Sequence, residues 1–179
     1  MQGRRTVPAT NYLDLLQLQA YWGPDRLNHH TAPTSMVYAL REALRIIDDE
    51  GLEPRWQRHE RANDAVVVGL EAMGLTLHGD RAHKAPMITL VNVPAGVDEA
   101  GVRRQLLEEH GIEIMAAFGT LNDKVWRIGL MGYNARLENA LTVLTALESV
   151  LTAQGFAVPA GAGVEAARAQ ARQAAAVPA

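Results

Sequence analysis

The chain has 179 residues, which suits one compact domain with a tail. Its hydrophobic share of 48%, charged share of 21% and net charge of −3 are typical of a soluble globular protein and give no electrostatic reason to bind nucleic acid or an anionic membrane. The absence of cysteine excludes disulfides, thiolate zinc sites and cysteine nucleophiles. Because we find neither a membrane-spanning apolar run nor a secretory signal, we expect a cytoplasmic protein.

The first half of the chain is predicted to be helical. Apolar residues at helical spacing predict helices over residues 12–22, from Thr34 or Ser35 to Gly51, and over residues 54–73. Hydroxyl side chains can cap the start of a helix, and a glycine can take the left-handed conformation that ends one.

The second half alternates strands and helices. Strands are predicted over residues 87–93, 112–118 and 124–130, and helices over residues 98–111 and 134–151. The residues expected to face the core are Val102, Leu106 and Leu107 in the first of these helices, and Leu137, Leu141, Leu144, Leu147 and Leu151 in the second.

This order of elements predicts an α/β (α+β) fold with two layers, in which helices cover one side of a small sheet. We divide the chain into a linker and large-domain end (1–33), a C-terminal small domain with its leading long helix (34–154), and an Ala-rich tail (155–179). The tail has few large apolar residues, so we expect it to be disordered.

Arg127 is a candidate binding residue because it lies inside an apolar strand. Alternation places Trp126 and Ile128 on one face of the strand and Arg127 on the other. A mid-strand arginine needs either an anionic partner or a solvated face, and its guanidinium matches a carboxylate. Spacing alone leaves open both a carboxylate site and an exposed edge-strand arginine.

The polar loop Asn28, His29, His30 and Thr31 precedes a predicted helix start. Such a loop can recognise phosphate beside the free N–H groups of the helix, or it can serve as an ordinary cap. Other chemistry lacks support: the six histidines show no metal-ligand spacing, and we find no nucleophile elbow or phosphate-binding glycine loop. We therefore predict no metal site.

Several segments, taken together and in order, resemble the class V (fold type I) pyridoxal-phosphate aminotransferases of the alanine/serine–glyoxylate group. The resemblance covers about residues 11–152. It is carried by residues 12–15 (YLDL), 29–31 (HHT), 38–43 (YALREA), 91–94 (VNVP), 111–115 (GIEIM) and 126–132 (WRIGLMG).

The resemblance implies roles for both clusters in a homodimeric enzyme that uses an amino-acid donor and glyoxylate. Arg127 is expected to bind the substrate carboxylate, with residues 118–119 at the entrance. Thr31 and His30 are expected to contact the cofactor phosphate, and Asn28 the substrate side chain, across the dimer interface.

The resemblance also implies that pyridoxal 5′-phosphate is held as a Schiff base on a large-domain lysine, upstream of residue 12 and so before Met1. The chain has only Lys84 and Lys124, and neither stands in that motif. We therefore expect no catalytic residue in this chain and no transamination by it in isolation.

Within the group, the resemblance is strongest to the bacterial branch that transfers an amino group from (S)-ureidoglycine to glyoxylate in purine (allantoin) catabolism. Asn28 stands where alanine–glyoxylate enzymes usually have tyrosine, and its amide can both donate to and accept from a ureido group. Two alternatives stay open: an alanine/serine–glyoxylate aminotransferase, and a non-enzymatic α/β module that binds a carboxylate or a partner.

Overall fold

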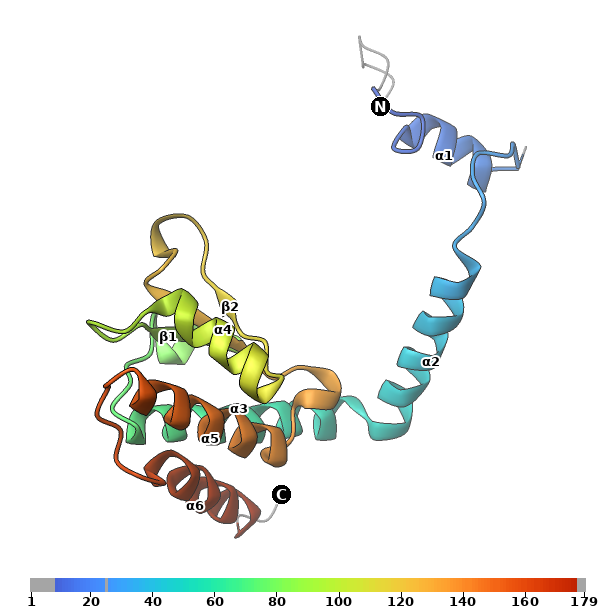
Figure 1. Ribbon diagram of the computed structural model, residues 1–179. Coiled ribbons are helices and arrows are strands. Elements are labelled where there is room, and N and C mark those ends of the chain that lie inside the picture. Colours follow the sequence, from blue (N-terminus) through green and yellow to red (C-terminus); the bar gives the residue numbers. More distant parts are fainter. Residues whose placement is uncertain (1–8, 25, 177–179) are drawn as a thin grey trace. The chain divides into compact units, whose positions relative to one another are not determined.

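The computed structural model describes residues 9–24 and 26–176 (Figure 1). The chain divides into two compact units, Met1–Asp49 and Glu50–Ala179. The long helix that we assigned to the small domain lies in the first of these contact units except for its last residue, Glu50. That helix has no buried side chain. Residues 1–8 and 177–179 of the expected linker and tail lie outside the described residues.

The first unit contains helices α1 (Leu15–Trp22) and α2 (Thr34–Glu50), close to the predicted ranges. The side chain of Asp14 caps α1 by accepting a hydrogen bond from the amide of Leu16 at 3.0 Å. Neither helix buries a side chain, although α2 carries an apolar stripe that includes Met36 and Leu40. This unit therefore presents much more apolar surface than a closed domain does.

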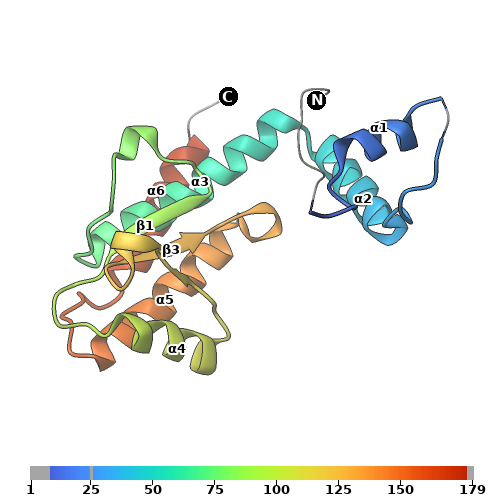
Figure 2. The same ribbon diagram turned by 90° about the horizontal axis from the view of Figure 1, so that it is seen from above.

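The second unit is a two-layer α/β domain, as predicted. Its sheet has the strand order β1-β3-β2, and both pairs are antiparallel. The domain also contains three short 3-10 helices, η1 (Arg81–His83), η2 (Gly119–Leu121) and η3 (Gly132–Asn134). The regular elements are α3 (Leu52–Ala72), β1 (Ile88–Asn92), α4 (Glu99–His110), β2 (Met115–Ala116), β3 (Val125–Gly129), α5 (Leu137–Ala153) and α6 (Ala162–Ala176). Figure 2 shows the sheet and its helices from above.

One face of the sheet forms the core with the helices. Trp126 and Ile128 of β3 and Val91 of β1 share a buried cluster with apolar residues of α3, α4 and α5. The indole N–H of Trp126 donates to the carbonyl of Glu99 at 3.3 Å, so its burial leaves no unpaired donor. Alternation along β3 then turns Arg127 to the opposite face of the sheet.

Leu107 was expected to face this core, and that prediction is wrong because its side chain is 52% exposed. The neighbouring Val102 and Leu106 of α4 are fully buried. The contact face of this short helix is narrow, so two apolar positions fill it and the third projects outward.

The tail was expected to be disordered, and this prediction is wrong for residues 162–176, which form α6. This helix packs along α3 through small residues. Ala167 is fully buried, and a Cβ added to Gly69 of α3 would lie 2.9 Å from the carbonyl oxygen of Gly163. Two backbones that approach closely bury surface without large side chains. The expectation of disorder considered only the number of large apolar residues and therefore missed this packing.

No helix among the described residues is long and apolar enough to cross a membrane.

Candidate carboxylate and phosphate sites

Arg127 lies in the middle of the central strand β3. Its Cα pairs with that of Leu90 on β1 and that of Met115 on β2, so the three residues form one row across the sheet. Arg127 is half-buried, while its neighbours Trp126 and Ile128 are buried on the helix-covered face. The strand therefore presents the guanidinium on the face that the helices leave open, as alternation predicts.

Two local contacts orient the Arg127 side chain. Its Nε–H donates to the carbonyl of Ala116 at 2.9 Å, and its Cζ lies 4.2 Å from the centroid of the Phe118 ring. The two Nη groups donate to no described residue. A guanidinium fixed through Nε and stacked on a ring keeps its Nη donors available for the two oxygens of a carboxylate.

A cavity of about 330 Å³ lies beside this row. Its lining includes Leu77, Ile88, Leu90 and the side of Arg127, and it also reaches Lys84. The exposed area of this lining is mostly apolar, which suits the carbon skeleton of a small ligand, and His78, Asp80 and Arg81 add ionisable groups to it.

The two lysines of the chain lie apart from any covalent-tether arrangement. The ammonium of Lys84 donates to Asn63 Oδ1 at 2.7 Å, and burial lowers the pKa of this lysine. Lys124 is exposed just before β3. Asn63 is itself buried and accepts from the hydroxyl of Thr89 at 2.9 Å, so Lys84 completes a structural cluster between α3 and β1.

The loop that holds Asn28 and Thr31 lies in the first unit, so the structure describes it separately from Arg127. The side chains of Asn28 and Thr31 are exposed and hydrogen-bond to no other described residue. Helix α2 begins at Thr34, so the loop lies directly before the N-terminal turn of this helix. This placement is compatible with phosphate contacts from Thr31.

His29 and His30 form a hydrogen-bonded pair within this loop. His29 Nε2 lies 2.8 Å from the carbonyl oxygen of Asn11, so this nitrogen donates. The two Nδ1 atoms lie 2.8 Å apart, and in the neutral pair His30 donates to His29. The rings of Tyr12 and Tyr21 lie 5.2 and 5.1 Å from that of His30 and hold it in place. His30 Nε2 is therefore the ring nitrogen left for a ligand.

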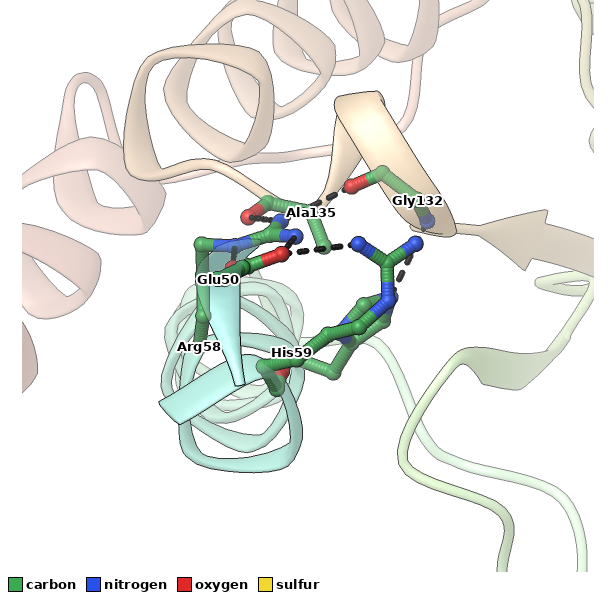
Figure 3. Close-up of polar contacts among 6 residues, drawn as sticks. Glu50, Arg58, His59, Gly132 and Ala135 are labelled. Carbon is green, nitrogen blue, oxygen red and sulfur yellow. Dashed lines mark hydrogen bonds and ion pairs between the residues drawn. The ribbon is translucent and has the colours of Figure 1, made fainter. Parts of the chain in front are cut away.

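A polar network that the sequence did not reveal joins α3 to the segment after β3 (Figure 3). Arg58 Nη1 donates to the carbonyls of Gly132 and Ala135, both at 2.8 Å, and His59 Nε2 accepts from the amide of Gly132 at 3.0 Å. Glu50 accepts from Arg58 at 2.5 Å and from Arg55 at 2.7 Å. No spacing pattern relates residues so distant in the chain, and His59 alone reads as a surface or structural histidine.

Among residues 9–24 and 26–176, no group of three or more histidines and carboxylates is arranged to hold a metal ion. His78 instead contacts Asn92 Oδ1 at 3.0 Å, and His83 contacts Asp80 Oδ2 at 2.6 Å.

The chain and its fold match an established family. The family model for class-V aminotransferases matches residues 5–137, and the chain belongs to this family, which depends on pyridoxal 5′-phosphate. Over 167 residues it is 48% identical to the (S)-ureidoglycine–glyoxylate transaminase of Bacillus subtilis, covering 93% of this chain and 40% of that protein. It is also 41% identical over 152 residues to the alanine–glyoxylate aminotransferase of Callithrix jacchus, covering 83% of this chain and 37% of that protein.

Solved structures agree with this assignment. The crystal structure of ureidoglycine–glyoxylate aminotransferase from Bacillus subtilis matches with a TM-score of 0.87 and 46% identity, over 96% of this chain and 44% of that one. Pyridoxamine–pyruvate aminotransferase from Mesorhizobium loti matches with a TM-score of 0.86 and 30% identity, over 97% and 44%. The fold is that of fold type I aminotransferases, and the chain spans about two fifths of the length of these relatives.

Proposed function

We propose that this chain supplies the substrate-carboxylate and cofactor-phosphate contacts of an aminotransferase that transfers an amino group from (S)-ureidoglycine to glyoxylate. The observation that carries the proposal is the pair of unengaged Nη groups of Arg127 beside an apolar cavity. The 48% identity to the (S)-ureidoglycine–glyoxylate transaminase of Bacillus subtilis supports the choice of substrates.

Arg127 acts by binding and orienting. Both the amino donor and glyoxylate carry a carboxylate next to the reacting carbon, so one guanidinium serves both halves of the reaction. A two-pronged contact fixes the plane of the carboxylate and thereby the direction of the bond to be broken. Phe118 shields one face of the guanidinium from water and keeps it in this orientation.

The residues present fit the phosphate end of pyridoxal 5′-phosphate and do not fit its covalent tether. Thr31 would offer a hydroxyl to the phosphate in a homodimer, across the subunit interface, and an imidazolium at His30 would add an Nε2–H, because the Nδ1–H of this ring donates to His29. When bound, this cofactor serves as the electron sink for the substrate α-carbon. Lys84 lines the cavity beside Arg127, but its ammonium donates to Asn63, and Lys124 is exposed just before β3, so neither is proposed to hold the cofactor.

Because the chain is proposed to lack the lysine that holds the cofactor, we expect the purified chain with added pyridoxal phosphate to show no lysine-dependent absorbance band. We also expect no turnover of amino donor and glyoxylate. The band together with turnover in the unmodified chain, both lost on substitution of Lys84 or Lys124, would contradict the proposed absence of a tether.

The whole activity is tested by a chimaera in which this chain replaces the matching 40% of the Bacillus subtilis relative. We expect the chimaera to transfer the amino group of (S)-ureidoglycine to glyoxylate more efficiently than that of alanine. We also expect Asn28→Tyr to lower kcat/KM for ureidoglycine more than for alanine, because the amide can both donate to and accept from the ureido group.

A well-folded chimaera without activity, or one that prefers alanine, would contradict the proposed donor. Equal losses on both donors in the Asn28→Tyr variant would remove Asn28 from the specificity argument. The matched control is Asn122→Tyr, which alters an exposed asparagine in the second unit.

A second candidate function is a carboxylate-binding α/β module without catalysis, and the closed core of the second unit favours it. This candidate predicts that the chain is a monomer in light scattering, whereas carboxylate binding by Arg127 is common to both candidates. The aminotransferase proposal instead expects the apolar surfaces of α1 and α2 to drive association of the isolated chain.

A further inference from the structure

His59 links helix α3 to residues 130–136, which we call the β3–α5 connection. Its Nδ1 lies 2.7 Å from the carbonyl oxygen of Arg55, one helical turn earlier, and its Nε2 lies 3.0 Å from the amide nitrogen of Gly132. Figure 3 shows the imidazole between the helix and the connection. The last sheet-like bond before this point runs from the amide of Leu130 to the carbonyl of Met87 at 2.9 Å.

The two contacts determine the protonation state of His59. A backbone carbonyl can only accept, so Nδ1 must carry a hydrogen. A backbone amide can only donate, so Nε2 must present its lone pair to Gly132. The imidazole is therefore neutral. A second proton on Nε2 would place one N–H donor against another, the amide of Gly132.

The charged side chains of the network around the imidazole come from two helices. On α3 these are Arg55 and Arg58, and at the end of α2 the carboxylate of Glu50 is shared between them. The connection presents only backbone groups to this network, the carbonyls of Gly132 and Ala135 and the amide of Gly132. Among the described residues, no carboxylate is hydrogen-bonded to His59 itself.

The connection reaches the face of the sheet that carries Arg127. The Cε of Met131 lies 3.3 Å from the position that a Cβ on Gly129 would take. Gly129 lies two residues beyond Arg127 on β3 and so shares its face. Met131 immediately precedes Gly132, so release of the Gly132 amide shifts a side chain that packs on the strand beside Arg127.

We propose that neutral His59 is a positioning residue for the carboxylate site at Arg127, because it holds Gly132 and with it the Met131 side chain. Protonation of His59 removes the hydrogen bond to the Gly132 amide, leaves Arg58 holding the carbonyls of Gly132 and Ala135, and weakens carboxylate binding. This inference rests on the proposed role of Arg127 and adds a proton-dependent control to that same site.

The test uses the full chain, nuclear magnetic resonance and glyoxylate as the probe. The His59 ring nitrogens and the Gly132 amide are followed from about pH 8 to pH 5, where imidazoles titrate, and glyoxylate affinity is measured at both ends. His59→Gln keeps an acceptor near the position of Nε2 and does not titrate there, whereas His59→Asn is too short to reach Gly132. His110→Gln, which alters the last residue of α4, is the matched control.

In the unmodified chain we expect Gly132 and His59 to titrate with one midpoint, and glyoxylate affinity to fall about 3- to 10-fold at the acid end. His59→Gln should bind equally at both pH values, His59→Asn should bind weakly at both, and His110→Gln should behave as the unmodified chain. Rescue by glutamine and not by asparagine separates positioning from a general loss of structure.

The proposal is overturned if Gly132 does not follow the His59 titration, or if it does and glyoxylate affinity is unchanged by pH. If Gly132 follows His59 but glyoxylate binds at neither pH, the proposed role of Arg127 fails and only the proton-dependent hydrogen bond stands.

Discussion

The guanidinium of Arg127 lies over the ring of Phe118, with Cζ 4.2 Å from the ring centroid. The Phe118 side chain is 74% exposed, so the ring interacts with Arg127 at the protein surface. A cation over an exposed ring gains about 0.5–1 kcal/mol. Phe118→Leu keeps apolar bulk and removes the ring face, so we expect glyoxylate affinity to fall about 2- to 5-fold. The measurement is a titration followed by calorimetry, with Met115→Leu as the control in the same row of the sheet. Unchanged affinity would show that the ring is not needed to orient the arginine.

Arg127→Lys and Arg127→Gln should both lower the affinity for glyoxylate, by about 10- to 100-fold, because hydrogen bonds to a charged group contribute about 1.5–3 kcal/mol. Lysine keeps the charge but lacks the planar fork, so we expect it not to restore binding. Thermal unfolding should change little, because Arg127 is not in the buried core. Arg104→Lys, on the exposed side of α4, is the control. Full binding by Arg127→Lys would mean that charge alone suffices.

Glu50 links acid stability to the network around η3. Hydrogen bonds from Arg58 and then Arg55 lower the pKa of this carboxyl from 4.5 to about 2. Its folded pKa is depressed, so its contribution to stability is complete above about pH 4.5 and is lost as the pH falls toward 2. We expect Glu50→Gln to lower the unfolding temperature at neutral pH and to have a progressively smaller effect between pH 4.5 and 2. Calorimetric scans across this range provide the test, with Glu60→Gln as an exposed control. An effect of equal size at every pH would contradict the ion-pair explanation.

Gly69 allows α3, α5 and α6 to approach closely. A Cβ there would lie 2.4 Å from Leu144 Cδ1 and 2.9 Å from the carbonyl oxygen of Gly163. Replacing a helix-interior glycine by alanine ordinarily stabilises a helix by up to about 1 kcal/mol, but overpacking costs about 1–3 kcal/mol. We therefore expect Gly69→Ala to destabilise the chain in urea unfolding. Gly163→Ala should cost less, because the nearest atoms to its added Cβ belong to the flexible side chain of Met73. Stabilisation by Gly69→Ala would show that α6 does not pack as described.

Local sequence patterns were sufficient to predict features that depend on a single segment of the chain. The spacing of apolar residues predicted α1 to α5, β1 and β3, whereas the strand predicted over residues 112–118 forms only over Met115–Ala116. Alternation in β3 placed Arg127 opposite Trp126. The ordered fragments that resemble class V aminotransferases led to the family that the family model shows. The roles of Asn28, His30, Thr31 and Arg127 stay predictions until substitution tests them.

The sequence by itself determined helices α1 to α5, strands β1 and β3, the family and the presence of only two lysines, because these depend on residue type and short spacing. Only the tertiary structure decided that α6 packs on α3, that Phe118 covers Arg127, and that His59 accepts from an amide 73 residues away. The physical reason is that close contacts and hydrogen bonds between distant segments arise from packing. The periodicity of residues along a single helix or strand carries no information about such contacts.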